Sequence, residues 1–260
     1  MSARCVSGAV MSEMVTPGRV VWRELMTKDV KRAQAFYGEL FGWKFEAFDM
    51  GPGNYDMVKV GEKSVGGLWQ MKPDMTEPSM WMSYVWVTDV DAAAKTAVEN
   101  GGKVVHGPGD IPNVGRFAVL TDFAGAMVCA FKPTGEAQPW AMPKTGEFCW
   151  ETLSTTDLAR AEAFYGKVFG WKTMKDNGIP VFSLDGTPRG MVADLQEAQN
   201  FPPNWMTYVV VDKVEPATER ASRLGGNVLV PLIEIPQVGR IGLIADPTGA
   251  PLGLYQPLMG

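Results

Sequence analysis

Apolar and polar residues alternate near the start of the chain and then follow a helical period. Residues 20–27 (VVWRELMT) alternate and are rich in bulky side chains, a pattern typical of a strand. In residues 30–42, apolar positions recur every three or four residues, which predicts an amphipathic helix that Asp29 caps and Gly42 ends. Three further strands are predicted between Gly, Pro and Asn residues, at 43–50, 54–60 and 63–71.

The same order of patterns then starts again. A strand is predicted at 81–88, and either Asp89 or Asp91 leads into an Ala-rich helix that ends at 100–102. Three strands follow, at 103–108, 114–122 and 126–133. Each half of this region therefore reads as strand, helix and three strands.

The whole arrangement occurs twice, which makes the chain an internal repeat. Three pairs of segments match: 22–43 with 150–171, 81–105 with 205–230, and 110–126 with 234–250. The numbering offset is 128 for the first pair and falls to 123–124 further along, so we expect the second copy to lack five residues in a rim loop between its second and third strands. We predict a disordered leader at 1–17, one domain at 18–132, a Pro- and Gly-rich linker at 133–146 and a second domain at 147–260.

Composition narrows the classes of function. The 260 residues are 46% hydrophobic, enough for a sizeable core, and carry a net charge of −5 with scattered basic residues. We therefore expect no nucleic-acid partner and no membrane partner. No apolar run approaches the roughly 20 residues of a membrane helix. Residues 1–17 lack the apolar segment of a secretion signal, and Cys5, Cys129 and Cys149 form no disulfide framework, so we expect a cytoplasmic protein.

Motifs shared by the two copies resemble those of a known superfamily. In each copy the motif D-x-x-x-A-x-x-F-Y-x-x-x-F-G-W follows the first strand, and an Asp-x-x-Gly-Ala segment precedes the last strand. Together they resemble the vicinal oxygen chelate superfamily of glyoxalases, bleomycin-resistance proteins and extradiol dioxygenases. The tandem arrangement looks like the two-domain glyoxalase-like proteins often labelled hydroxylases. The resemblance implies an α+β fold of four βαβββ units whose mixed sheets curl into open cups that bind ligands. The sequence leaves open whether a cup forms within one copy or across both.

The resemblance also implies metal-ligand positions, and these hold no His or carboxylate. Family members place ligands on the first, fifth and last strands of a copy. The matching residues here are Trp22, Met82 and Cys129 in copy one, and Trp150, Met206 and Gly253 in copy two. The one His of the chain, His106, lies in a turn outside them. We therefore expect no metal and no cofactor. A carboxylate-only magnesium or manganese site, and a soft copper(I) pair of Cys129 with Met82, remain alternatives to ordinary packing.

Glu24 is the candidate for catalysis. Alternation along the first strand places it on one face with Trp22 and Met26, inside the implied cup, where Thr152 occupies the matching position of copy two. Burial among apolar side chains raises the pKa of a carboxyl toward neutrality, which suits a general acid or base. The alternative is a salt bridge from Glu24 to a rim Arg or Lys, or hydrogen bonds to it from backbone N–H groups.

The remaining candidates are residues that we expect to contact a substrate. Arg116 and Arg240 could hold a carboxylate or phenolate at the mouth of a cup, but pairing with Asp110 and Glu234, or with Asp122 and Asp246, is the competing interpretation. The aromatic and thioether candidates have core packing as their alternative. The substrate-binding set is Trp22, Met82, Tyr84, Trp86, Cys129, Trp150, Thr152, Met206, Tyr208, Arg116 and Arg240.

The leading hypothesis is a metal-independent glyoxalase-like protein that binds a small hydrophobic or aromatic molecule. It would either sequester that molecule or catalyse a non-redox lyase, isomerase or cyclase reaction with Glu24 as the acid or base. The alternatives are a metal-dependent glyoxalase, lyase or dioxygenase, a hydroxylase as the family label suggests, and a regulatory protein without a ligand. We expect a monomer, in which the two copies form a pseudo-dimer, or a homodimer.

Overall fold

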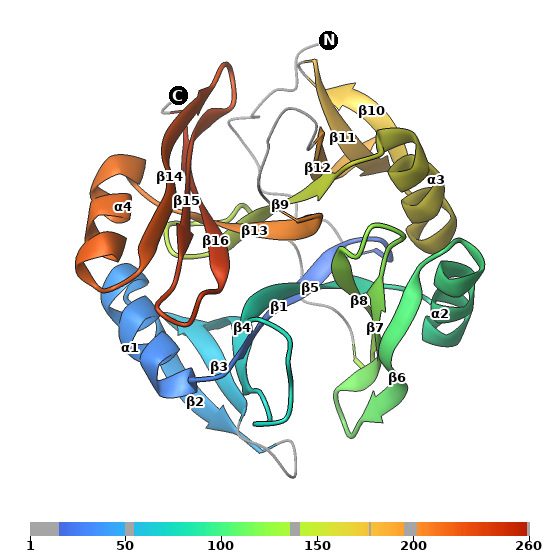
Figure 1. Ribbon diagram of the computed structural model, residues 1–260, viewed down its shortest axis with the longest axis horizontal. Coiled ribbons are helices and arrows are strands. Elements are labelled where there is room, and N and C mark those ends of the chain that lie inside the picture. The colour runs from blue at the N-terminus through green and yellow to red at the C-terminus, as the bar shows by residue number, and fades with distance from the viewer. Residues whose placement is uncertain (1–15, 50–54, 136–140, 177, 195–201, 259–260) are drawn as a thin grey trace.

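The computed structural model describes residues 16–49, 55–135, 141–176, 178–194 and 202–258. These residues form two eight-stranded sheets and four helices (Figure 1). The strand order is β2-β3-β4-β1-β5-β8-β7-β6 in the first sheet and β10-β11-β12-β9-β13-β16-β15-β14 in the second. The predicted α+β fold with mixed, open sheets is therefore confirmed.

Each sheet is built from one copy of the repeat, so each cup forms within a copy. Copy one consists of β1 (Val20–Thr27), α1 (Val30–Phe41), β2 (Lys44–Phe48), β3 (Tyr55–Val60), β4 (Lys63–Gln70), β5 (Met80–Trp86), α2 (Val90–Glu99), β6 (Lys103–Ile111), β7 (Gly115–Thr121) and β8 (Met127–Pro133). Its two βαβββ units join where β1 runs antiparallel to β5.

Copy two repeats this order. It consists of β9 (Phe148–Thr155), α3 (Leu158–Phe169), β10 (Lys172–Asp176), β11 (Ile179–Leu184), β12 (Thr187–Asp194), β13 (Asn204–Val210), α4 (Val214–Arg223), β14 (Asn227–Ile235), β15 (Gly239–Ala245) and β16 (Pro251–Pro257). Strand β3 of copy one corresponds to β11 of copy two, with Tyr55 matching Ile179 and Val58 matching Phe182. The numbering offset between the copies is therefore 124 from β3 onward. The second copy is therefore shorter by four residues, not the five predicted, and the difference lies between β10 and β11.

The two copies pack back to back through their helices and the convex faces of their sheets. α1 lies beside α4, and α2 lies beside α3 (Figure 1). The central strands β5 and β13 also contact each other. Each of the two large apolar cores mixes side chains from both copies: Leu25 and Phe36 share one core with Val209 and Leu254, and Val85 and Leu120 share the other with Phe164 and Trp205. Neither copy therefore has a helix-side core of its own.

The Tyr and Trp residues of the repeated motif serve this interface between the copies. The Tyr165 hydroxyl donates to Asp122 Oδ2 of the other copy at 2.9 Å and accepts from Trp205 Nε1 at 2.9 Å. Trp171 Nε1 donates to the Gly18 carbonyl at 2.9 Å, as Trp43 Nε1 does to a carbonyl on the other side of the molecule. Tyr37 and Tyr165 are buried, as are Trp43 and Trp171. These hydrogen bonds therefore satisfy polar groups that water cannot reach. The motif that signals the family thus holds the pseudo-dimer together.

Two predictions from the sequence concern a leader at the start of the chain and the absence of a membrane helix. The leader predicted at 1–17 falls almost entirely outside the described residues. Within the described residues, no helix is long and apolar enough to cross a membrane.

Candidate functional site

The face of the first sheet opposite its helices carries a separate apolar cluster, which we call cup one. Its floor consists of the buried side chains of Met82, Tyr84, Val119, Cys129 and Phe131. Half-buried side chains pack against this floor, so part of the apolar surface is accessible to a ligand; they include Trp22, Met26, Met80, Phe117 and Met127.

Glu24 lies in the middle of cup one because of the strand register. It pairs with Met82 of β5 on one side and with Gly67 of β4 on the other. Trp22 pairs with Tyr84, which in turn pairs with Cys129 of β8. Since side chains two residues apart share a face, a carboxyl, an indole, a phenol and a thiol project from the same face of the sheet.

A short hydrogen-bond chain holds the Glu24 carboxyl. The Tyr84 hydroxyl donates to Glu24 Oε1 at 2.9 Å. The Tyr55 hydroxyl hydrogen-bonds to the same carboxyl and accepts from Trp22 Nε1 at 2.8 Å. The carboxyl is therefore fixed by two phenols, one of which is itself held by an indole.

Burial raises the pKa of Glu24 from 4.5 to about 7. The hydrogen bonds from Tyr84 and Tyr55 act in the opposite direction because they stabilise the charged form. Among the described residues, no Lys or Arg contributes to this shift. Burial and the neighbouring Glu24 also raise the pKa values of the Tyr84 phenol and the Cys129 thiol well above their usual ranges. Glu24 is thus a carboxyl in cup one whose pKa lies near neutral pH.

Tyr55 can reach Glu24 because Gly67 has no side chain. A Cβ atom at position 67 would lie 2.0 Å from the Tyr55 hydroxyl oxygen and 2.3 Å from the ring carbon that bears it. The phenol therefore crosses β4 at the one residue type that leaves room for it.

Copy two carries a different set of side chains at the matching positions, which we call cup two. Its cluster contains Met206, Tyr208 and Ile241, with half-buried Trp150 and Cys149 beside them. Thr152 replaces Glu24, Met191 replaces Gly67, and Ile179 replaces Tyr55. The Tyr208 ring lies over Gly253, where a Cβ would be 2.2 Å from the ring. At these matching positions, among the described residues, cup two therefore has neither a carboxyl nor the phenol–indole chain.

The structure brings most of the candidate residues together in two groups. Trp22, Met82, Tyr84 and Cys129 surround Glu24 in cup one, and Trp150, Thr152, Met206 and Tyr208 occupy cup two. Trp86 is half-buried at the end of β5, two residues beyond Tyr84 on the same face. Of the two interpretations of Glu24, the structure has the carboxyl bonded to phenols rather than to a rim Arg or Lys.

Arg116 and Arg240 lie on the helix side of their sheets rather than in the cups. Arg116 donates to Asp91 of α2 at 2.7 and 2.9 Å and to Asp110 at 3.0 Å. Arg240 pairs with Glu234 at 2.7 Å and with Glu215 of α4 at 3.2 Å. The pairing with Asp110 and Glu234, which the sequence offered as the competing interpretation, is therefore the arrangement observed. The additional bonds to Asp91 of α2 and Glu215 of α4 connect each of these helices to its sheet.

Sequence reasoning missed Tyr55, the second phenol that contacts Glu24. The signal was available in the comparison of the copies, because Tyr55 and Gly67 change together to Ile179 and Met191. It went unnoticed because the third strand carries no ligand position in the family pattern.

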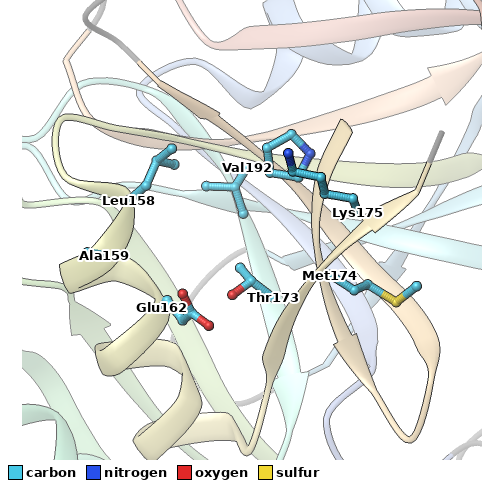
Figure 2. A pocket seen from close by; sticks show the side chains of 8 residues that line it. Leu158, Ala159, Glu162, Thr173, Met174, Lys175 and Val192 are labelled. Atoms are coloured by element: carbon cyan, nitrogen blue, oxygen red, sulfur yellow. The ribbon is translucent and has the colours of Figure 1, made fainter. Parts of the chain in front are cut away.

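Two shallow hollows on the surface lie away from both cups. One, of about 380 Å³, lies between α3 and β10, where Glu162 and Thr173 face each other (Figure 2). The other, of about 460 Å³, lies beside the end of α1 and the start of α4, and includes Lys213 and Arg220. Neither contains a cluster of titratable groups with shifted pKa values, so we assign the candidate chemistry to cup one.

The donors in cup one do not fit the metal that the fold family implies. Divalent iron, zinc and manganese take imidazole or carboxylate ligands, and a thiol binds as its thiolate. Cup one offers one carboxyl, thioethers, an indole whose N–H is bonded to Tyr55, and a thiol whose pKa burial raises. The described residues contain no group of three His, Cys, Asp or Glu side chains that could hold an ion.

Fold and site together define a tandem glyoxalase-like protein with one carboxyl-bearing cup. Family models agree with this class. The model for the Glyoxalase/Bleomycin resistance protein/Dioxygenase superfamily matches residues 149–254, and a bleomycin resistance protein-like N-terminal model matches residues 19–61. Residues 149–254 of the chain therefore belong to the Glyoxalase/Bleomycin resistance protein/Dioxygenase superfamily.

Similar proteins span nearly the whole chain. "Putative glyoxylase CFP32" of Mycobacterium tuberculosis is 29% identical over 253 residues, which cover 91% of this chain and 94% of that protein. The anthracycline biosynthesis protein DauV of Streptomyces sp. (strain C5) is 27% identical over 252 residues, covering 90% and 91%. Among solved structures, the 2,3-dioxygenase LapB from Pseudomonas sp. KL28 superposes with a TM-score of 0.60 at 12% identity, covering 95% of this chain and 93% of that one. These structures share the fold.

Proposed function

We propose that cup one binds a small hydrophobic or aromatic molecule and that Glu24 exchanges a proton with it, without a metal ion. The observation that carries this proposal is the Glu24 carboxyl itself. It is held by Tyr84 and Tyr55 inside an otherwise apolar hollow and has its pKa raised to about 7. An acid or base whose pKa lies near the working pH is the most effective in proton transfer.

The lining of the cup supports a flat ligand. Trp22, Phe117 and Trp86 offer ring faces and edges, and the half-buried methionines offer polarizable surface that adapts to an aromatic ring. Relatives named for anthracycline biosynthesis are consistent with this, since anthracyclines are fused-ring aromatic compounds. The activity we infer is non-redox proton transfer of the kind that isomerases, cyclases and lyases use.

A pair of matched variants tests the binding half of the proposal. N-phenyl-1-naphthylamine, a neutral aromatic dye that fluoresces in apolar surroundings, would be titrated into the wild type, Trp22→Ala and Trp150→Ala. We expect Trp22→Ala to weaken binding about tenfold, because it removes a large apolar wall of cup one, and Trp150→Ala to have a smaller effect. No saturable binding to the wild type, in dye concentrations up to its solubility, would refute the proposal.

Deuterium exchange tests the proton-transfer half. Glu24 would remove the proton from the carbon next to the carbonyl of deoxybenzoin, an aromatic ketone that forms an enol, and D₂O would supply the deuteron that returns to that carbon. We expect faster deuterium incorporation with the wild type than with Glu24→Gln, measured by proton NMR. Equal rates for the two proteins would limit cup one to binding.

A further inference from the structure

Four methionines lie side by side across cup one, a group that we call the methionine strip. Met26 of β1 pairs with Met80 of β5, and Met82 follows two residues later on the same face. The parallel register of β5 with β8 pairs Tyr84 with Cys129, so it places Met82 beside Met127. All four belong to the cup one cluster, and three of them are half-buried.

Copy two does not repeat this strip. Ser154, Asn204 and Pro251 stand at the positions of Met26, Met80 and Met127, and only Met82 keeps its thioether, as Met206. The strip is therefore a feature of cup one alone and cannot be explained by the needs of the shared fold. Flexible thioethers side by side suit the face of a planar aromatic ring.

The hydrogen-bond donors around Glu24 are engaged with one another. The Trp22 N–H is bonded to Tyr55, and the Tyr84 and Tyr55 hydroxyls are bonded to the carboxyl. A carboxylate has about four lone-pair sites, so Glu24 keeps room to accept further hydrogen bonds. Arg116, which could have bound an anion, lies on the helix side of the sheet. The open lone pairs of Glu24 therefore favour a ligand that donates a hydrogen bond. Among the described residues no Lys or Arg acts on Glu24, so its charge would oppose a negatively charged ligand; the ring of His106 packs against Phe117 instead, 5.6 Å between centroids.

We propose that the ligand of cup one is a planar aromatic compound with a hydroxyl group, whose rings lie on the methionine strip while the hydroxyl donates to Glu24. This rests on the proposed function of cup one and narrows it to phenols rather than aromatic hydrocarbons or carboxylates. Cup two lacks both the strip and the charged acceptor, since Thr152 stands in place of Glu24, so we expect one molecule to bind per chain.

Three ligands of nearly equal shape test this: naphthalene, 2-naphthol and 2-naphthoate, titrated at pH 8, where Glu24 is mostly ionised. The wild type is expected to bind 2-naphthol about tenfold more tightly than naphthalene, which is the order of effect of a hydrogen bond to a charged group. It is expected to bind 2-naphthoate most weakly, and calorimetry should give one site per chain for 2-naphthol.

The variant Glu24→Gln separates this inference from the general proposal. It removes the negative charge, so the preference for 2-naphthol should fall and the affinity for 2-naphthoate should rise, a reciprocal change that misfolding cannot produce. Glu99→Gln, the same change on the exposed surface of α2, is the control. Binding of none of the three ligands would overturn the proposed function. Naphthalene bound as tightly as 2-naphthol, with no effect of Glu24→Gln, would overturn only the claim that the ligand is a phenol.

Discussion

The properties of cup one follow from a few residues that differ between the copies. Glu24 replaces a hydroxyl, Tyr55 replaces an aliphatic side chain, and Gly67 replaces a methionine, relative to the matching positions of copy two. The three changes depend on one another, since Tyr55 reaches Glu24 only across Gly67. A half-buried carboxyl is tolerated here because phenols hydrogen-bond to it and because it can take up a proton.

The raised pKa of Glu24 makes the stability of the protein depend on pH. Between 4.5 and about 7, the folded protein keeps a proton that the unfolded chain has lost, so raising the pH favours unfolding across this window. The cost levels off above pH 7 at no more than about 3.5 kcal/mol, at about 1.4 kcal/mol per pH unit between 4.5 and about 7. Glu24→Gln removes this dependence, so its free energy of unfolding relative to the wild type should rise from pH 4.5 to pH 7.5.

Urea unfolding of both proteins at several pH values measures the difference. Glu99→Gln is the control, because its carboxyl is exposed. A difference between Glu24→Gln and the wild type that stays constant across the window would show that Glu24 has an ordinary pKa.

At the scale of elements, each of the four helices follows the first strand of one βαβββ unit, but their N-terminal caps differ. Asp29, Asp89 and Asp157 each cap their helix by accepting from a backbone N–H near 3.0 Å. Lys213 stands at the matching position of α4 and makes no side-chain capping bond. Its positive charge also lies at the positive end of the helix dipole. The start of α4 therefore lacks the Asp cap of the other three helices, although Gln256 Oε1 accepts from the Val214 N–H at 3.1 Å.

Lys213→Asp should stabilise the protein by about 0.3–1 kcal/mol, because it places a negative charge at the positive end of the helix dipole. The capping bond of the other three helices is not open to it, since the residue three positions on is Pro216, which has no backbone N–H. Thermal unfolding would show this stabilisation as a higher Tm. Lys213→Asn, which removes the positive charge without adding a negative one, separates the loss of the lysine from the gain of a carboxylate. An unchanged or lower Tm for both variants would mean that the start of α4 is already satisfied.

Most elements could be predicted because local patterns decide them. Apolar alternation, Asp caps and Gly stops recur in both copies and give four helices and sixteen strands in the right order. Two features required long-range information. The capping of α2 by Asp89 rather than Asp91 depends on the pairing of Asp91 with Arg116 of β7. The four-residue difference near β11 depends on strand register. The chemistry around Glu24 was only partly predicted, since Tyr55 reaches it from a strand 31 residues away in sequence.

At the scale of the whole molecule, the repeat produces one folding unit rather than two independent domains. Both helix-side cores contain residues of both copies, and Arg23 of β1 forms a buried ion pair with Glu151 of β9. The cups lie on the opposite faces, so they can diverge without disturbing the interface. This explains how copy two could lose the carboxyl while its Tyr and Trp contacts remain.

Residues 147–260 expressed alone should therefore not form a stable monomer. The isolated copy would expose the apolar side chains of α3, α4 and the convex face of its sheet, and we expect it to aggregate or to pair with a second copy of itself. Co-expression with residues 16–146 should restore a soluble complex. Light scattering of the purified fragment tests this, and a stable monomer with cooperative unfolding would contradict a shared core.

The most direct test of the central claim is a titration of the Glu24 carboxyl itself. Carbon-13 NMR of protein labelled at the glutamate side-chain carboxyl, with Glu24→Gln to assign the signal, reports the midpoint without any ligand. A carboxyl held by Tyr84 and Tyr55 in an apolar cup should titrate with a pKa of about 7. A midpoint near 4.5 would mean that water surrounds Glu24, and would remove the basis for proton transfer in cup one.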